Sequence, residues 1–159
     1  MDAFLENIMS DEARIIRCAP HPRRWERFSN RHELAWTSVP FVRGGANIVP
    51  DTAGFYCFVV ANAIGHLPAV FYPLYAGETE DLRRRYGDYL REKSSSRGRI
   101  HVRKFLNVFA GEVAFAFAPY VSEKSARLSV EKELNDALMP PYSKKDFSAE
   151  VKGPMGAWQ

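Results

Sequence analysis

Residues 73–90 read PLYAGETEDLRRRYGDYL, and the interpretation of the whole chain starts from them. We expect Thr79 to cap a helix that begins at Glu80. Four side chains then share one face at helical spacing: Leu82, Tyr86, Tyr89 and Leu90. Arg85 takes the remaining position on that face, so its guanidinium must turn inward beside two tyrosines. An inward arginine is costly unless it meets an anion or several acceptors, and Arg85 is therefore the first indication of a binding site.

The segments around this helix have the composition of strands. Residues 53–61 and 69–76 are β-branched and aromatic, and residues 62–68 have the Asn, Gly and Pro of a turn, which predicts an antiparallel hairpin. Residues 112–121 alternate large apolar residues with alanines, which predicts a third strand with a helix packed closely on its alanine face. With further helices expected over 99–110 and, capped by Ser122, to about Leu138, the fold class is α+β: a small three-stranded, mainly antiparallel sheet flanked by helices.

We divide the chain into a helical, basic N-terminal arm (1–50), a central domain (51–143) and a C-terminal tail (144–159). Residues 1–17 have the pattern of a helix, and the tail is expected to be irregular. Residues 21–36 mix arginines with aromatic side chains. Such a segment can grip phosphates and stack on bases, or it can dock a peripheral helix onto the core, and we favour docking.

Composition argues against several classes of protein, including membrane-spanning, secreted and zinc-binding proteins. The 159 residues are 46% hydrophobic and suit one globular domain. No apolar run approaches the roughly 20 residues of a membrane span, and acidic residues within the first seventeen do not suit a signal peptide, so we expect a cytoplasmic protein without a membrane partner. Cys18 and Cys57 are expected to be reduced, and their spacing to the four histidines matches no zinc signature.

The net charge is only +3, but its distribution is uneven. Residues 14–43 hold seven arginines against two acids, and residues 83–104 hold nine cations against two acids. Two basic stretches beside a nearly neutral half indicate a polyanion such as DNA, although solvated basic faces without a ligand are an alternative. The candidate DNA-binding residues are Arg23, Arg24, Arg84, Arg97, Arg99, Arg103 and Lys104.

The last helix offers one carboxylate for chemistry. At about 100° per residue, Glu131 lies at the edge of the apolar face that includes Leu128 and Leu134, whereas Glu133 points toward water. One buried carboxylate, one inward arginine and several tyrosines suit phosphodiester hydrolysis with a hard cation such as Mg²⁺. A purely structural Arg–Glu pair bridged by tyrosines remains the alternative from these residues alone.

The order of these residues resembles the GIY-YIG nuclease superfamily. The matching positions are Gly54, Phe55, Tyr56, Tyr75, Ala76, Gly77, Asp81, Leu82, Arg85 and Tyr89, followed by Glu131, Leu134, Pro140 and Tyr142. The resemblance spans Gly54 to about Ser143, and the combination of motifs is more specific than any single one. Tyr89 stands where many members have histidine and the excision-repair branch has tyrosine, and Ser143 stands where the family usually has asparagine.

The resemblance implies a role for each residue. Tyr56 would be the base or water-positioning group, Tyr75 its hydrogen-bonding partner, Arg85 the phosphate clamp, and Glu131 the ligand of one Mg²⁺ or Mn²⁺ per active site. The long first hairpin and the N-terminal arm are similar in architecture to the short restriction endonucleases of the superfamily.

We therefore expect a divalent-metal-dependent DNA endonuclease of restriction or defence type. Cutting duplex DNA from one site per chain requires two strand breaks, so a homodimer is expected. The alternatives are a structure-specific repair nickase, a nucleic-acid-binding module that does not cleave, and a metal-free structural domain.

Overall fold

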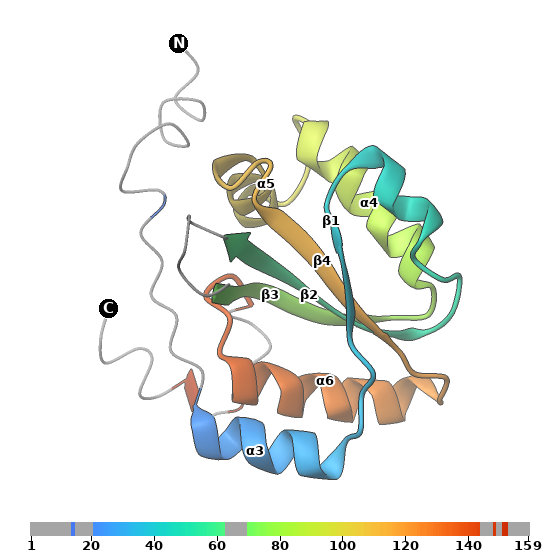
Figure 1. Ribbon diagram of the computed structural model, residues 1–159, viewed down its shortest axis with the longest axis vertical. Coiled ribbons are helices and arrows are strands. Elements are labelled where there is room, and N and C mark those ends of the chain that lie inside the picture. Colours follow the sequence, from blue (N-terminus) through green and yellow to red (C-terminus); the bar gives the residue numbers. More distant parts are fainter. Residues whose placement is uncertain (1–13, 15–20, 63–69, 144–147, 149–150, 153–159) are drawn as a thin grey trace.

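In the described part of the chain, four strands pair into one antiparallel sheet in the order β1-β4-β2-β3. They are β1 (Thr37–Pro40), β2 (Gly54–Asn62), β3 (Val70–Thr79) and β4 (Val113–Pro119). The computed structural model in Figure 1 describes residues 14, 21–62, 70–143, 148 and 151–152. The expected α+β class and the antiparallel hairpin of β2 and β3 are confirmed.

The expected count of three strands is wrong, because β1 adds a fourth. It pairs with β4, and Val39 lies opposite Phe115. Its sequence, TSVP, has a single buried residue and a proline, too little for a period of two to stand out from a loop. Proline is tolerated because β1 is an outer strand of the sheet. The sheet therefore begins within residues 1–50, which the sequence pattern had assigned to an arm.

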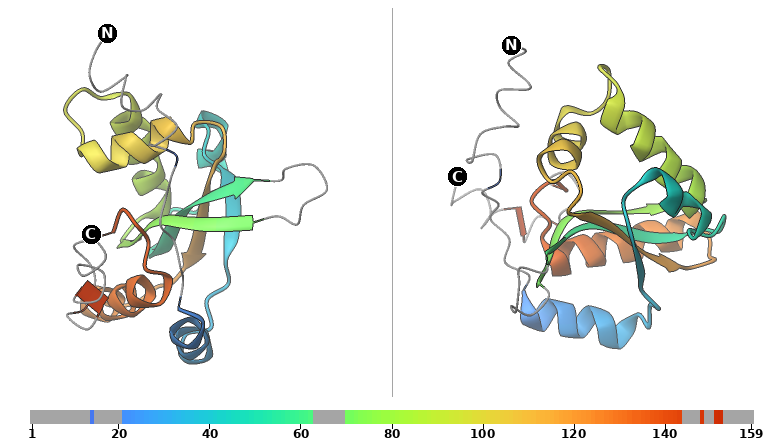
Figure 2. Two further views of the ribbon diagram at one scale, coloured as in Figure 1. Left: turned by 90° about the vertical axis from the view of Figure 1, so that its left-hand side faces the viewer. Right: turned by 45° about the horizontal axis from the view of Figure 1, so that its top comes forward.

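Helices cover both faces of the sheet. On one face lie α4 (Leu82–Ser94) and α5 (Ile100–Val108), with the short 3-10 helix η1 (Arg43–Asn47) beside α4. On the other face, α6 (Lys124–Leu138) and α3 (Pro22–Arg31) lie side by side (Figures 1 and 2). We call these the α4–α5 face and the α6 face.

The two faces have different cores. The α4–α5 face is built from large aromatic residues, including Phe58, Phe105 and Phe115, each fully buried. The α6 face has small residues of the sheet, Ala76 and Ala114, in contact with a cluster that includes Val130 and Leu134 of α6. The expectation that the alanines of the third predicted strand allow close helix packing is confirmed for Ala114.

Helix α4 begins two residues later than expected. Asp81 is its N-cap, and the Asp81 carboxylate accepts a hydrogen bond from Arg84 N at 2.8 Å. Thr79 instead exchanges hydrogen bonds with the backbone of Asp81. Both residue types cap helices well, and Asp81 is the cap here because β3 continues through Thr79. The predicted inward face of α4 is confirmed, with Leu82, Tyr86 and Tyr89 buried.

Helix α6 also departs from the prediction in detail. Its N-cap is Glu123 rather than Ser122, and Leu128, expected on the apolar face, is 46% exposed. Glu133 was expected to point toward water, but its carboxylate pairs with Arg31 at 2.9 Å and with His32 at 3.2 Å. The reason is tertiary: α3 packs beside α6, which no pattern within α6 itself could show.

The preferred docking role of residues 21–36 is confirmed. Phe28 of α3 is buried in the core of the α6 face, and Trp25 packs against that core. Cys57 is buried and not in a disulfide. Three other predictions lie largely outside the described residues, as does Cys18: the helix over 1–17, the turn over 62–68 and the irregular tail over 144–159.

Candidate functional site

Three tyrosines from three elements meet on the α4–α5 face. The Tyr56 and Tyr89 hydroxyls lie 2.8 Å apart, and either can donate the hydrogen bond. Tyr75 stacks on Tyr56 with ring centroids 6.4 Å apart and meets the Tyr89 ring edge-on at 6.2 Å. Tyr75 was expected to be the hydrogen-bonding partner of Tyr56, but that partner is Tyr89, because helix α4 places its hydroxyl directly against Tyr56.

The structure shows why residue 77, which follows Tyr75 and Ala76, is a glycine. It lies opposite Tyr56 in the β2–β3 register, and a Cβ added to it would lie 2.7 Å from Tyr56 Cζ and nearer still to the hydroxyl. The sequence predicted a close backbone approach at this glycine by a substrate or another segment. The approaching group is the Tyr56 side chain, so Gly77 makes room for the tyrosine cluster.

Arg85 points into the structure from α4, as its helical position predicted. Its side chain is half-buried, and its Nε is fully buried without a hydrogen-bond partner among the described residues. Its charge lies near enough to Tyr56 to act on the pKa of that hydroxyl. Since buried polar groups in native proteins are normally hydrogen-bonded, this nitrogen is a candidate binding atom for an anionic ligand.

Glu131 reaches the same edge of the sheet from the opposite face. Its Oε1 accepts a hydrogen bond from Glu78 N at 3.0 Å. Glu78 follows Gly77 in β3, so the carboxylate and the Tyr56 hydroxyl lie beside adjoining residues of one outer strand. The structure thus brings α4 and α6 side chains to one strand edge, although the two helices pack on different faces (Figure 1).

The segment after α6 occupies the rest of that edge. Tyr142 N donates to Leu74 O at 3.0 Å, and the buried Ser143 hydroxyl accepts from Ala76 N at 3.0 Å. Together with Glu131 at Glu78, alternate residues of β3 are capped along its outer side. Ser143, which stands where the resembling family has asparagine, therefore binds the backbone of the strand that carries Tyr75 and Gly77.

The environment of Tyr56 bears on its chemistry. Burial raises the pKa of Tyr56 well above its ordinary value of 10, and the neighbouring Tyr89 and Tyr75 raise it further, whereas the Arg85 charge lowers it. The hydroxyl is consequently neutral at physiological pH. Of the two roles that the sequence left open for Tyr56, this environment favours positioning a water or a phosphate oxygen over acting as a base.

Some charged side chains have partners that the sequence did not indicate. Glu92 and Arg99 form an ion pair at 3.0 Å, and the Arg99 guanidinium lies over the rings of Tyr75 and Tyr89. Arg99 had been predicted only as a DNA-binding residue, and Glu92 had no assigned role. The buried Arg127, which pairs with Glu78 at 2.8 Å, was not predicted. In the sequence, charged residues in basic or mixed stretches resemble solvent-exposed residues, because their ion-pair partners become evident only in the tertiary structure.

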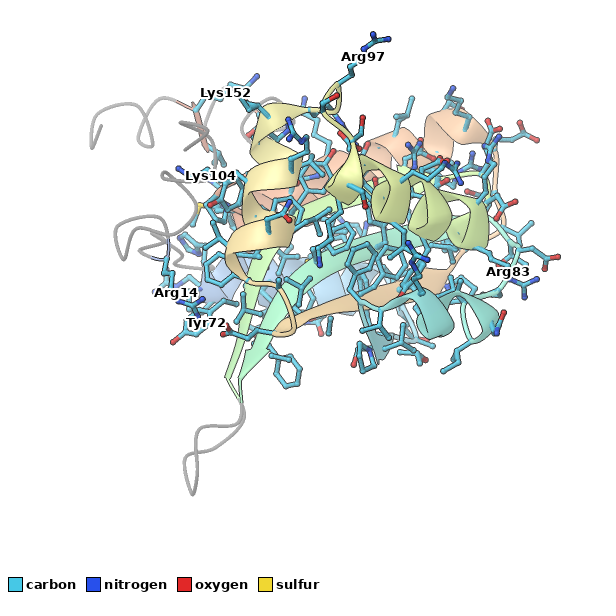
Figure 3. All side chains as sticks on the ribbon, turned by 90° about the horizontal axis from the view of Figure 1, so that it is seen from above. Arg14, Tyr72, Arg83, Arg97, Lys104 and Lys152 are labelled. Atoms are coloured by element: carbon cyan, nitrogen blue, oxygen red, sulfur yellow. The ribbon has the colours of Figure 1, made fainter. Side chains whose placement is uncertain are left out.

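The predicted DNA-binding residues separate into two groups. Arg84 lies on α4, Arg97 projects from the connection between α4 and α5, and Lys104 lies on α5 (Figure 3). Arg99 and Arg103 belong to the same α4–α5 group. Arg23 and Arg24 lie on α3, against the opposite face of the sheet. One nucleic-acid segment that follows the tyrosine cluster can therefore contact the α4–α5 group more directly than Arg23 and Arg24.

The donor set determines which metal the site could hold. Within the described ranges no group of three or more His, Cys, Asp or Glu side chains gathers as metal ligands. Glu131 is a carboxylate fixed by a backbone N–H at the edge of β3, one residue along the strand from Gly77, which lies against Tyr56. Such a set fits a hard cation that takes one protein carboxylate and completes its shell with water and a phosphate, as Mg²⁺ does.

Searches among protein-family models, curated proteins and solved structures found no match to this chain. A function for the protein must therefore be inferred from the geometry of its site and from the order of its residues. Among the described helices, none has the length and apolar character required to cross a membrane.

Proposed function

We propose that this protein is a divalent-metal-dependent endonuclease that hydrolyses phosphodiester bonds of DNA, of restriction or defence type. The observation that carries the proposal is Arg85: an inward arginine with a buried Nε that lacks a partner in the described part of the chain, beside a buried pair of tyrosine hydroxyls. A phosphate would complete this arrangement. The sequence order that resembles the GIY-YIG superfamily supports the same function.

In this proposal, the charged Arg85 and the neutral Tyr56 have different roles. Arg85 offsets the negative charge that grows on the phosphoryl oxygens as water attacks the phosphorus. The Tyr56 hydroxyl, neutral and held by Tyr89, orients the attacking water or a phosphoryl oxygen. As the water oxygen bonds to phosphorus, the bond from phosphorus to the leaving oxygen breaks; the attacking water gives up a proton to solvent, and the leaving oxygen takes a proton from solvent.

Glu131 would hold the metal. When bound there, Mg²⁺ or Mn²⁺ supplies Lewis-acid polarisation of the phosphate and stabilises the leaving oxygen. The Glu78 N–H fixes the orientation of the carboxylate by binding one of its oxygens.

The test is incubation of the purified protein with supercoiled plasmid DNA and Mg²⁺ or Mn²⁺. We expect cleavage, and a loss of about 100-fold or more in Arg85→Ala and Glu131→Ala. Glu133→Ala is the matched control, because Glu133 lies on the same helix and pairs with α3 instead. Nicking by either site variant at the parental rate would refute the proposal.

The products of this digest distinguish a restriction enzyme from a repair nickase and from a binding module that does not cleave. Linear DNA with defined ends indicates a restriction enzyme, and a dimeric mass in solution is then expected. Nicks confined to branched or damaged DNA indicate a repair nickase. Salt-sensitive binding without products under any divalent metal indicates a binding module that does not cleave.

A further inference from the structure

Arg99 is held in a defined orientation beside the tyrosine cluster. Its Nε donates to Glu92 Oε1 at 3.0 Å and its Nη2 to Glu92 Oε2 at 3.0 Å. The backbone N–H of Arg99 also donates to Glu92 Oε1, at 2.7 Å. A bidentate pair with a third hydrogen bond fixes the plane of the guanidinium as well as its position.

The fixed guanidinium contacts two of the three tyrosines. Arg99 Cζ lies 5.3 Å from the centre of the Tyr89 ring and 5.9 Å from that of Tyr75, within the range of cation–π attraction. Its Nη1 donates to the Tyr75 hydroxyl at 3.4 Å. Because arginine has no acceptor, the Tyr75 oxygen must accept this bond, and the Tyr75 proton points in another direction.

Arg85 and Arg99 thus act on different tyrosines of the cluster. Arg85 acts on Tyr56, and Arg99 on Tyr75 and Tyr89. The two arginines also differ in pairing, since Glu92 neutralises Arg99 locally whereas Arg85 Nε has no partner among the described residues. A charge that is already paired and oriented is better suited to holding other side chains than to capturing a phosphate.

We propose that Arg99, oriented by Glu92, is a positioning residue that holds the Tyr75 hydroxyl as an acceptor and directs the Tyr75 proton toward the bound phosphodiester. The inference rests on the proposed function of the site. It goes beyond that function by assigning a role to an ion pair that joins the end of α4 to the start of α5.

Steady-state cleavage of duplex DNA by Arg99→Gln, Arg99→Lys and Glu92→Gln tests the proposal. For Arg99→Gln we expect a fall of about 10- to 100-fold in kcat, with KM for DNA changed by less than about twofold. Glu92→Gln and Arg99→Lys should show smaller falls in kcat, because each keeps part of the arrangement. Arg31→Gln, which breaks the Arg31–Glu133 pair on the α6 face, is the matched control and should leave both constants unchanged.

A phosphate-binding role for Arg99 predicts the opposite pattern. KM would then rise at unchanged kcat, and the salt dependence of binding would weaken by about one counterion. That outcome overturns the positioning role, and so does an unchanged kcat in all three variants.

A second measurement does not depend on cleavage. With tyrosine labelled by ¹³C at Cζ, the Tyr75 signal is assigned by its loss in Tyr75→Phe. Loss of the Arg99 hydrogen bond should shift that signal in Arg99→Gln and Glu92→Gln but not in Arg31→Gln. If the parent cleaves no DNA, the proposed function fails while this signal still decides whether Arg99 holds Tyr75. An unmoved Tyr75 signal in Arg99→Gln overturns the inference, and Glu92→Gln serves the same purpose should Arg99→Gln not fold.

Discussion

Two arginines on different helices point toward the sheet, and the structure treats them differently. Arg127 of α6 is 4% exposed and fully engaged: it pairs with Glu78 at 2.8 Å, lies 3.8 Å from Glu80 and donates to Ser122 O. Arg85 of α4 is half-buried, and its Nε has no partner within the part of the chain that the structure describes. The two arginines thus differ in how far the fold satisfies them, and this difference is the reason why we propose a ligand-binding role for Arg85.

The two faces of the sheet also differ in their polar contacts. On the α6 face, ion pairs tie helices together or to the sheet, as Arg31–Glu133 and Arg127–Glu78 do. On the α4–α5 face, tyrosine hydroxyls gather near Arg85, whose Nε has no partner among the described residues, and the Glu92–Arg99 pair joins α4 to the start of α5. We interpret the α4–α5 face and the edge of β3, where Glu131 arrives from α6, as the candidate reactive side.

Replacing each inward arginine by methionine is expected to give the largest difference in stability between two variants. Arg127→Met leaves the Glu78 carboxylate buried without its partner, and we expect about 3–5 kcal/mol of destabilisation in urea unfolding. Arg85→Met removes a poorly satisfied group and should leave stability unchanged or slightly higher while abolishing cleavage. Equal losses of stability in the two variants would contradict the distinction.

Gly77→Ala tests how tightly the tyrosine cluster is built. The new methyl group would overlap the Tyr56 ring and hydroxyl, and the displacement should cost about 1–3 kcal/mol and weaken the Tyr56–Tyr89 contact. Gly44→Ala is the control, because an added Cβ there meets no atom within 4 Å. Thermal unfolding and aromatic circular dichroism measure both effects, and equal behaviour of the two variants would mean that Tyr56 is not confined.

Alkaline unfolding tests the burial of Tyr56. Its pKa in the fold is raised above the ordinary value of 10, so its stabilising contribution is complete below pH 10. Above pH 10 the unfolded chain loses this proton while the folded chain keeps it, and stability should fall by roughly 1 kcal/mol over the next pH unit. Tyr56→Phe should fall less steeply, whereas replacing the exposed Tyr72 should leave the slope unchanged.

The smallest effect concerns Glu92. Although burial opposes it, the hydrogen bonds and charge of Arg99 lower the pKa of Glu92 below its ordinary 4.5. The pair therefore stabilises the fold above about pH 4.5, and this contribution is lost as pH falls through the lowered pKa. Since Arg99 is partly exposed, Glu92→Gln should cost less than about 1 kcal/mol at neutral pH and flatten the acid limb of the stability curve.

Much of the fold followed from local patterns. The apolar run of β2, the inward face of α4 and the end of α6 before Pro140 lie within a few residues of their predicted places. The fourth strand did not follow, because β1 has four residues and a single buried side chain, Val39. The true cap of α4 was also missed, because Thr79 and Asp81 are both suitable caps and only the length of β3 decides between them.

The candidate site was predictable in its residues but not in its contacts. The spacing of Arg85 on α4 indicated an inward guanidinium, and Glu131 was separated from Glu133 by helical geometry alone. Which hydroxyl pairs with Tyr56 was not predictable, because Tyr75 and Tyr89 lie on different elements. The partnerships of Arg99 and Arg127 depend in the same way on contacts between elements.

The sequence by itself determined which side chains turn inward, because the periods of helices and strands are local properties of the chain. Only the tertiary structure decided which of those side chains meet: it brought Glu131 around the edge of β3, set Tyr89 against Tyr56, and satisfied Arg127 while leaving Arg85 Nε without a partner in the described residues. Pairing between distant segments depends on how helices pack on a sheet, and no short stretch of residues specifies that packing.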